Sequence, residues 1–376
     1  MIQTIHEIFT TNFKGKGSFY AAAGRINLIG EHTDYNEGFV MPGAIDKGIY
    51  AEVKPNNSRM VRVYSFDFNE FAEFEIGSDE LPKQSWMRYI YGVCQETIKR
   101  GGVVKGFDAA FMGDLPVGAG LSSSAALESV FGFAINDLFN DGAIDKMELA
   151  RIGQSTEHNY CGVKCGIMDQ FASIFGRKGQ LMRLDCRSME YEYFPFDAEG
   201  YRLVLINSKV KHELVDSPYN RRRESCERVA GVLGTPSLRG VSMESLEAIK
   251  DQISQEDYTR AKYVIGEEFR VLDLCEALKA GDMERAGVNI YATHDGLSKD
   301  YEVSCEELDF LVDVARECGV TGSRMMGGGF GGCTINLIKN EIYDTFTATA
   351  VEKFNAKYGI NPEVIDVVIS DGARNL

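Results

Sequence analysis

The sequence predicts a mixed fold of α-helices and β-strands that is divided into more than one domain. Its 376 residues are enough for roughly two or three domains of ordinary size. Short apolar stretches typical of strands alternate with longer stretches of helical periodicity, and this alternation favours helices packed against sheets. With 44% hydrophobic residues, each domain can bury a core.

The expected elements follow in chain order. Strands are predicted over Val61–Phe66, Phe107–Met112, Leu181–Leu184, Tyr201–Asn207, Thr334–Ile338 and Val364–Ile369. The clearest helix carries Leu127, Val130, Phe131, Ala134, Ile135 and Leu138 at the spacing of one helical face. Further helices are predicted over Asn220–Leu233, Tyr258–Ala280, Cys305–Glu317 and Ile342–Lys357. The segment 176–179 is the expected divide between two domains, residues 1–178 and 179–376.

The charge balance and the cysteines narrow the class of protein. Forty basic against 56 acidic residues give a net charge of −16, which disfavours nucleic acid as a partner because such binding rests on neutralised phosphates. A small anionic ligand needs only a few local donors. No apolar stretch is long enough to span a bilayer and no secretory signal is visible. The nine cysteines are expected to be free thiols in a reducing cytoplasm.

A first cluster of polar residues lies at positions 23–36, after Gly24. Apolar residues alternate with Arg25 and Asn27 before the polar run Glu31-His32-Thr33-Asp34, a pattern typical of a buried strand that emerges into a turn. Carboxylates on such a turn can accept hydrogen bonds from the hydroxyls of a sugar or polyol. A solvated loop and a His/Glu/Asp metal site remain the alternatives.

A second cluster, Leu115–Ala126, runs directly into the clearest helix. Glycines allow backbone N–H groups to approach an anion, and a helix N-terminus adds unpaired donors and partial positive charge. Three consecutive serines, Ser122–Ser124, offer hydroxyls for phosphate or Mg²⁺. The segment therefore predicts a phosphate site that is not a Walker A loop. Helix capping by one serine is the structural alternative.

A third cluster, residues 324–333, formally contains G-x-G-x-x-G at Gly327, Gly329 and Gly332. A dinucleotide fingerprint opens a helix, whereas the residues after Gly332 have the pattern of a strand. The cluster is therefore interpreted as a loop whose backbone approaches a ligand or another loop closely, with a tight structural turn as the alternative.

Two acidic residues complete the pattern. Glu157 falls late in a helix-like stretch, and Asp169 lies between Met168 and the apolar run Phe171–Phe175. A carboxylate in such a setting needs a cation, and Arg25 or Mg²⁺ would serve. The alternative for Asp169 is helix capping.

Taken together, these segments resemble the GHMP family of small-molecule kinases and, within it, the galactokinase branch. Residues 24–35 (GRINLIGEHTDY) resemble the signature of that branch, 116–126 (PVGAGLSSSAA) the ATP loop of the family, and 326–333 (MGGGFGGC) its third glycine-rich motif. Residues 165–170 (CGIMDQ), 185–188 (DCRS) and 219–223 (YNRRR) are also similar to galactokinases. The resemblance implies an α+β, two-domain GHMP kinase fold, with mixed sheets packed against helices and the active site between the domains.

The resemblance also implies roles for individual residues. Asp169 matches the catalytic aspartate, and Arg25 the arginine opposite it at the reacting phosphate. The implied sugar contacts are Glu31, His32, Thr33, Asp34, Gly166 and Tyr219. The implied ATP contacts are Gly118, Ala119, Gly120, Leu121, Ser122, Ser123 and Ser124, with Trp86 and Tyr89 near the adenine. Trp86 and Tyr89 are equally compatible with the core face of a helix. Ser124 and Glu157 are the implied Mg²⁺ ligands.

The function expected from this resemblance is ATP-dependent phosphorylation of galactose at the anomeric hydroxyl, which yields galactose 1-phosphate and ADP. The expected partners are the substrates galactose and ATP, with Mg²⁺ as the cofactor. Neither nucleic acid nor a membrane is an expected partner. The protein is expected in the cytoplasm, and the sequence does not fix its oligomeric state but is compatible with a monomer. One alternative is a related kinase for N-acetylgalactosamine or arabinose. Another is a regulator that binds galactose and ATP without catalysis. A nicotinamide oxidoreductase is a distant third, because a strand follows the third glycine cluster.

Overall fold

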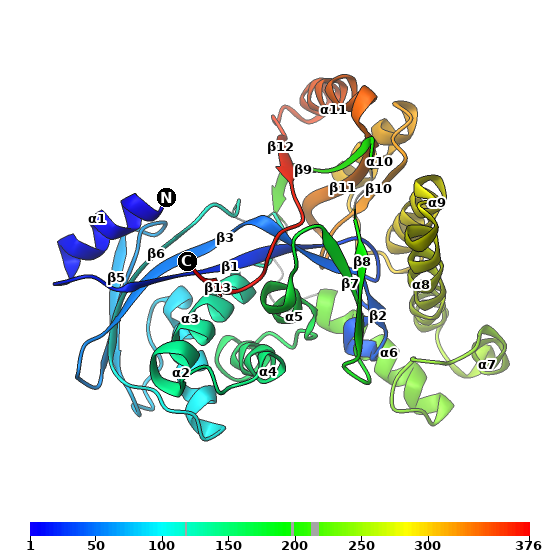
Figure 1. The fold of residues 1–376 in the computed structure, drawn as a ribbon. Coiled ribbons are helices and arrows are strands. Elements are labelled where there is room, and N and C mark those ends of the chain that lie inside the picture. Colours follow the sequence, from blue (N-terminus) through cyan, green and yellow to red (C-terminus); the bar gives the residue numbers. More distant parts are fainter. Residues whose placement is uncertain (117–118, 197–198, 212–217) are drawn as a thin grey trace.

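The computed structural model describes residues 1–116, 119–196, 199–211 and 218–376 (Figure 1). Its largest sheet has the strand order β13-β1-β3-β6-β4-β5. These strands are β1 (Ser18–Asn27), β3 (Pro42–Pro55), β4 (Met60–Ser65), β5 (Glu70–Glu75), β6 (Phe107–Gly113) and β13 (Arg374–Asn375). Neighbouring strands are antiparallel except for β4 and β6, which run parallel.

Helices cover both faces of this sheet. On one face lies α1 (Ile2–Asn12), which packs Ile5 and Phe9 against it. On the other face lie α2 (Ser85–Lys99), α3 (Ser123–Asn140), α4 (Lys146–Thr156) and α5 (Met168–Phe175), as Figure 1 shows. The apolar face predicted for residues 127–138 belongs to α3, and Val130 and Phe131 are completely buried against the sheet. The apolar residues at helical spacing thus fix which face of α3 packs against the sheet.

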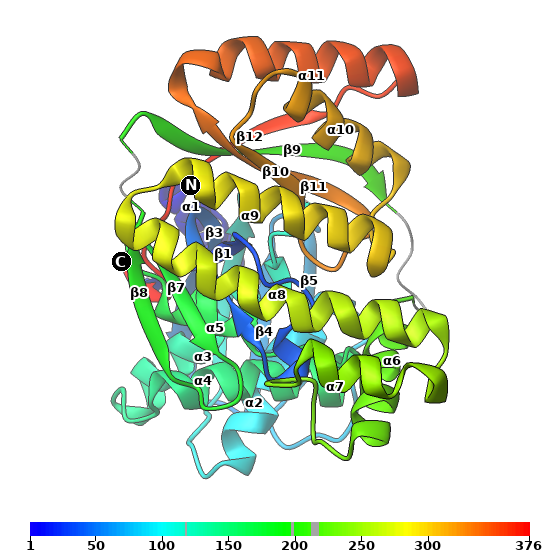
Figure 2. The ribbon, with the colours of Figure 1, turned by 90° about the vertical axis from the view of Figure 1, so that its right-hand side faces the viewer.

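A second, four-stranded sheet has the order β10-β11-β9-β12. Its strands are β9 (Tyr201–Lys211), β10 (Gly322–Met325), β11 (Gly331–Lys339) and β12 (Glu363–Val367), all antiparallel to their neighbours. Figure 2 shows α10 (Glu306–Glu317) and α11 (Tyr343–Tyr358) on one side of it and the neighbouring helices α8 (Gln255–Ala280) and α9 (Met283–Asp295) on the other. The helices α6 (Pro218–Leu233) and α7 (Met243–Ala248) pack against α8.

Several contacts join segments that are distant in the sequence. A three-stranded sheet pairs β2 (Phe39–Val40) with β7 (Gln180–Asp185), which in turn pairs with β8 (Tyr191–Pro195). The strand β13 returns to pair with β1. The division of the chain between residues 178 and 179 stays a prediction, because strands that precede this point, β1 and β2, pair with strands that follow it, β13 and β7. Short helical turns lie at Asp34–Asn36, Glu157–Cys161, Lys250–Gln252, Gly296–Asp300 and Asn340–Ile342.

The structure confirms the predicted fold class and the order of the predicted elements. Each predicted strand and helix is present with bounds shifted by a few residues. The predicted strand Val364–Ile369 is too long at its end: β12 stops at Val367, and Ile369 instead forms an isolated bridge with Ile45. All nine cysteines are free thiols. In the described part of the chain, no helix has the length and apolar character needed to cross a membrane.

Candidate active site

Two adjoining cavities lie where the two large sheets meet. One, of about 630 Å³, is lined by glycines and by charged and polar residues that include Arg25, Asp34 and Asp169; we call it the polar cavity. The other, of about 890 Å³, has walls of Phe66, Phe68, Trp86, Tyr89 and Phe111; we call it the aromatic cavity. Ser124, in the first turn of α3, lines both. A ligand with one flat apolar end and one polar end could therefore occupy both cavities at once.

Arg25 and Asp169 form a bidentate ion pair at the wall of the polar cavity. The Nε and Nη2 groups of Arg25 donate to the two carboxylate oxygens of Asp169 at 2.7 and 2.9 Å, and Nη1 donates to the Gly120 carbonyl at 2.6 Å. Burial works against the charge on Arg25, but Asp169 and further carboxylates outweigh it and raise its pKa. The side chain of Asp169 is 28% exposed, against 6% for Arg25, so the carboxylate remains open to the cavity.

The serine-rich loop joins this pair to the start of α3. Ser122 precedes the helix in a left-handed conformation (φ 58°), and its hydroxyl donates to Asp169 rather than capping the helix. Capping by one serine, the structural alternative for this segment, is therefore not what Ser122 does, and the alternative of helix capping by Asp169 is not observed either. Since Ser122 makes no capping bond, the N–H groups of the first turn remain available to an anion, with the helix dipole in support.

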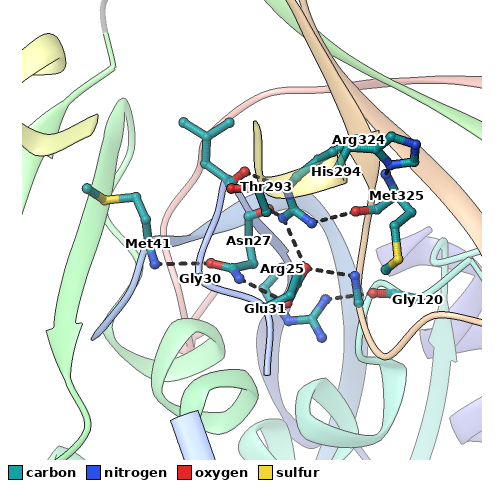
Figure 3. Close-up of polar contacts among 12 residues, drawn as sticks. Arg25, Asn27, Gly30, Glu31, Met41, Gly120, Thr293, His294, Arg324 and Met325 are labelled. Carbon is teal, nitrogen blue, oxygen red and sulfur yellow. Dashed lines mark hydrogen bonds and ion pairs between the residues drawn. The ribbon is translucent and has the colours of Figure 1, made fainter. Parts of the chain in front are cut away.

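Glu31 connects the first glycine cluster to the third. Figure 3 shows its carboxylate between Asn27 and Arg324, which donate to it at 3.0 Å each. The backbone N–H of Gly327 adds a third hydrogen bond at 2.7 Å. Arg324 is completely buried and also donates to the carbonyls of Leu28 and Met325. Glu31 still lines the polar cavity, and an ionised carboxylate has about four acceptor sites.

His32 and Asp34 project from the same turn into the polar cavity. His32 has a positive φ of 63°, and its Nδ1 lies 2.7 Å from the hydroxyl of Tyr35. Burial lowers the pKa of His32 to about 4, so the imidazole is neutral near pH 7. Burial, and then the nearby charge of Asp169, raise the pKa of Asp34 to about 7. The turn therefore offers neutral and weakly acidic hydrogen-bonding groups, which suit hydroxyls better than cations.

Gly166 leaves room for Asp34. A β-carbon at this position would lie 1.8 Å from Oδ2 of Asp34, far inside the contact distance of real atoms. Both residues line the polar cavity. The Asp34 carboxylate can therefore occupy its observed position only because residue 166 has no side chain.

Thr33 is not brought into the cavity. Its side chain is completely buried, and its hydroxyl lies 2.8 and 2.6 Å from the carbonyls of Gly30 and Phe39. The implied sugar contact by Thr33 is therefore not compatible with the geometry, because the hydroxyl is used to close the turn. Thr33 shapes the loop that presents its neighbours.

Ser124 and Glu157 meet where the two cavities join. The hydroxyl of Ser124 donates to the Glu157 carboxylate at 2.9 Å. Burial, followed by the charge of Asp169, raises the pKa of Glu157 to about 7. Glu128 lies behind it and shares the amide of Gln170, and burial also raises the pKa of Glu128 well above its usual value. A bound cation would stabilise the charged form of such buried carboxyls.

The predicted adenine residues lie in the aromatic cavity. Trp86 and Tyr89 both line it from α2, and both also pack on the N-terminal core. Their packing on the core confirms the interpretation as a core face, whereas their contact with adenine stays a prediction. The indole N–H of Trp86 donates to Glu70 at 2.9 Å, and the ring stacks on the exposed Phe68. The cavity thus has flat apolar walls, which suit a nucleobase.

Other predicted site residues are buried or lie outside the described residues. Ala119 and Leu121 are buried in a hydrophobic core, so only their backbone can reach a ligand. Gly118 lies outside the described residues, as does the side chain of Tyr219. Sequence reasoning assigned no role to Arg324, although it is the first residue of the third cluster. It also missed Gln170 and Glu128, whose contacts link separate helices and leave no local sequence signal.

The third glycine cluster forms the connection of a β-hairpin. It joins β10 to β11, with Gly327 and Gly329 at φ values of 84° and 90°. A dinucleotide fingerprint would join a strand to a helix, so the observed hairpin confirms that the motif is not one. Gly327 and Gly328 line the polar cavity instead.

No group of three metal-binding side chains is assembled anywhere in the described residues.

Comparison with known proteins gives concordant matches. The chain matches family models described as the galactokinase galactose-binding signature over residues 7–55, the GHMP kinase N-terminal domain over 88–177 and the GHMP kinase C-terminal domain over 274–356. It is 42% identical to a galactokinase of Thermotoga petrophila over 94% of this chain and 99% of the relative. It is 41% identical to a galactokinase of Glaesserella parasuis, covering 94% and 93%.

Solved structures show the same likeness. The structure of Lactococcus lactis galactokinase complexed with galactose superposes with a TM-score of 0.95 and 32% identity, over all of both chains. A mevalonate kinase from Methanococcus jannaschii has a TM-score of 0.64 at 18% identity, over 95% of this chain and all of that one. The second likeness concerns the fold alone.

Proposed function

Because the chain belongs to the galactokinases, a branch of the GHMP kinase family, we propose that it transfers the γ-phosphoryl group of ATP to the anomeric hydroxyl of galactose. The products are galactose 1-phosphate and ADP. One observation carries the proposal: the Arg25–Asp169 pair lies in a polar cavity that adjoins an aromatic one at the N-terminus of α3. A sugar and a nucleotide bound in these cavities would meet beside that pair.

In this proposal the sugar occupies the polar cavity. Glu31, His32 and Asp34 line it, and Gly166 lies directly against Asp34. Their carboxylate and imidazole groups can accept and donate hydrogen bonds to a ring of hydroxyls. We retain Tyr219 as a proposed contact from sequence resemblance alone, and we omit Thr33 because its hydroxyl bonds to the backbone.

ATP would place its adenine in the aromatic cavity and its phosphates at the start of α3. Trp86 and Tyr89 would contact the base, and the backbone of residues 118–124 would contact the phosphates through N–H groups. Phosphoryl transfer asks the protein mainly for positioning and for stabilisation of charge. The unpaired donors of a helix N-terminus supply both without reorganisation.

Asp169 and Arg25 would act on the reacting atoms. Asp169 would accept the proton of the anomeric hydroxyl as that oxygen attacks the γ-phosphorus. Arg25 would offset negative charge on the transferred group, while its two hydrogen bonds hold the carboxylate in place.

Mg²⁺ fits the residues at the junction of the cavities. Its preferred ligands are oxygen atoms, and with nucleotides it takes only one or two protein ligands beside phosphates and water. Ser124 and Glu157 provide a hydroxyl and a carboxylate 2.9 Å apart, backed by a second buried carboxyl, Glu128. Bound there, the ion would neutralise phosphate charge. We therefore propose Ser124 and Glu157 as its ligands.

Replacing Glu157 tests this assignment. We expect Glu157→Gln to raise the Mg²⁺ concentration needed for half-maximal rate by at least about tenfold, because a neutral amide is a poor ligand. Galactose affinity measured without nucleotide should not change. Glu268→Gln is the matched control, since Glu268 is also buried with a pKa raised to about 7 but lines neither cavity. An unchanged Mg²⁺ requirement in Glu157→Gln would refute the role.

A panel of sugars tests the function itself. ADP release should be measured with galactose, glucose, N-acetylgalactosamine and arabinose, each at saturating ATP. We expect galactose to give by far the highest kcat/KM. Preference for N-acetylgalactosamine or arabinose would instead identify a related sugar kinase. Saturable binding of galactose and ATP without ADP release would identify a regulator.

The contact between Gly166 and Asp34 gives a prediction for the sugar site. In Gly166→Ala the new methyl group would overlap the Asp34 carboxylate, so we expect the KM for galactose to rise at least about tenfold, the scale of one lost charge-assisted hydrogen bond. The KM for ATP should change little. Gly231→Ala is the control, because a methyl group there meets no atom within 4 Å. An unaltered galactose KM in Gly166→Ala would count against Asp34 as a sugar ligand.

We also propose a cytoplasmic location, supported by the nine free cysteines, which persist as thiols in a reducing compartment.

We further propose that the chain has two functional halves, divided near residues 178 and 179. Residues from both sides of that point line both cavities, such as Asn220 in the polar one and Asn207 in the aromatic one.

A further inference from the structure

The aromatic cavity has an unusual charge distribution for a site that receives a polyanion. Three carboxylates line it, those of Asp67, Asp114 and Glu363. Asp67 and Asp114 each accept a backbone N–H, from Gly113 and Gly48. Among the described residues that line this cavity, Lys209 is the one cationic side chain. A nucleotide that enters therefore meets a single positive charge contributed by the C-terminal sheet.

A bulge in β9 carries Lys209. Gly331 pairs with Lys211 and Cys333 pairs with Asn207, so four steps along β9 oppose two steps along β11. The hydroxyl of Ser208 donates to the carbonyl of Gly332 at 2.8 Å and so anchors the bulge. Bulges interrupt the alternation of side chains along a strand and redirect individual residues, often beside active sites.

The backbone of Lys209 is itself constrained. Its φ is 59°, a left-handed conformation that is unfavourable for a residue with a β-carbon. The side chain of Asn207 stabilises it by accepting the Lys209 N–H at 3.0 Å. Asn207 lines the same cavity. The strand β9 thus keeps an unfavourable backbone conformation at Lys209, the one described residue that presents an ammonium group to the aromatic cavity.

The ammonium group of Lys209 is not neutralised within the described residues. No carboxylate of the described chain lies within ion-pair distance of it, whereas Lys339, on the adjacent strand, is paired with Glu284 at 2.9 Å. Lys209 is also exposed, so its charge remains hydrated and available. An unpaired lysine in a cavity that also contains Ser123 and Ser124 is suited to a phosphate.

We propose that Lys209 binds the phosphate chain of the nucleotide, so that the C-terminal sheet supplies the cation and the start of α3 supplies the backbone donors. This inference rests on the proposed function, because it assumes that the aromatic cavity receives ATP. It assigns a nucleotide contact that neither glycine-rich loop provides.

The test is a set of calorimetric titrations with ATP, ADP and adenosine in the absence of sugar. We expect Lys209→Gln to weaken ATP and ADP binding by about five- to tenfold, the scale of one charge-assisted contact at a solvated site. Adenosine, which lacks phosphates, should bind equally to both proteins. Lys209→Arg should retain affinity within about twofold. The difference between wild type and Lys209→Gln should shrink at high salt, because screening weakens exposed charge pairs.

The control is Lys339→Gln, which removes the same charge from the same sheet at the end that pairs with Tyr201. It should leave all three affinities unchanged. An unaltered ATP affinity in Lys209→Gln, or an equal loss for adenosine, would overturn the role of Lys209 alone. A wild-type protein that does not bind ATP would overturn the proposed function and this inference with it. Glutamine carries the same backbone cost at φ 59°, so folding should not differ.

Discussion

An Asp169→Asn variant is expected to lose about three orders of magnitude in kcat, within the range attributed to a positioned general base. The amide cannot accept the proton of the sugar hydroxyl, and its NH₂ group would face a donor, either Arg25 or Ser122. ATP binding should persist, since the proposed phosphate donors belong to the backbone. The rate is measured as ADP release, and ATP binding by the fluorescence of Trp86, the single tryptophan, which lines the aromatic cavity.

The chain contains a matched control for this variant. Arg62 and Asp108 form a second bidentate pair with the same two distances, 2.7 and 2.9 Å, on the strands β4 and β6. Asp108→Asn therefore removes an equivalent ion pair from a position that lines neither cavity. It should alter stability without altering kcat. If Asp169→Asn retains more than about a tenth of the wild-type kcat, the assignment of Asp169 as the base is wrong.

Replacing Arg25 by lysine is expected to lower kcat by about 10²- to 10³-fold, the scale of losing one preorganised donor to a developing charge. Lysine keeps the positive charge but cannot bond to both oxygens of Asp169 and to the Gly120 carbonyl at once. The base would be less well oriented, and the positive charge would be less well positioned at the phosphoryl group. The measurement is kcat at saturating galactose and ATP, with Arg62→Lys as the control.

Combining the two changes gives a further check. If Arg25 and Asp169 work as one unit, Arg25→Lys with Asp169→Asn should be little slower than Asp169→Asn alone, because the second change removes what is already lost. Fully multiplied effects would mean that the two residues act independently, which contradicts the mechanism proposed for the pair.

The sequence predicted those features that depend on local pattern. Apolar spacing located α3, and the glycines and serines before it predicted an anion site at its start. The strand pattern after Gly332 correctly excluded a dinucleotide fold. Asp169 was expected to need a cation because it lies among apolar residues, and Arg25 was one of two candidates for that role. In the structure this arginine pairs with it.

The features that local pattern missed depend on contacts between distant residues. Arg324 is buried against Glu31, which lies far from it in the sequence. The residues around each of them contain no pattern that predicts this contact. The bulge that carries Lys209 depends on how β9 pairs with β11. The resemblance implied a sugar contact by Thr33, but successive residues of a tight turn point in different directions, and its hydroxyl faces the backbone.

The strand β13 affects how the chain folds during synthesis. Tyr20 of β1 pairs with Asn375, so the edge of the first strand cannot be completed until residue 375 has left the ribosome. Until then its N–H and C=O groups are a template on which a second nascent chain can pair. Slow translation of the segment that precedes β13 would prolong this interval, and we therefore expect the yield of soluble protein to depend on elongation rate.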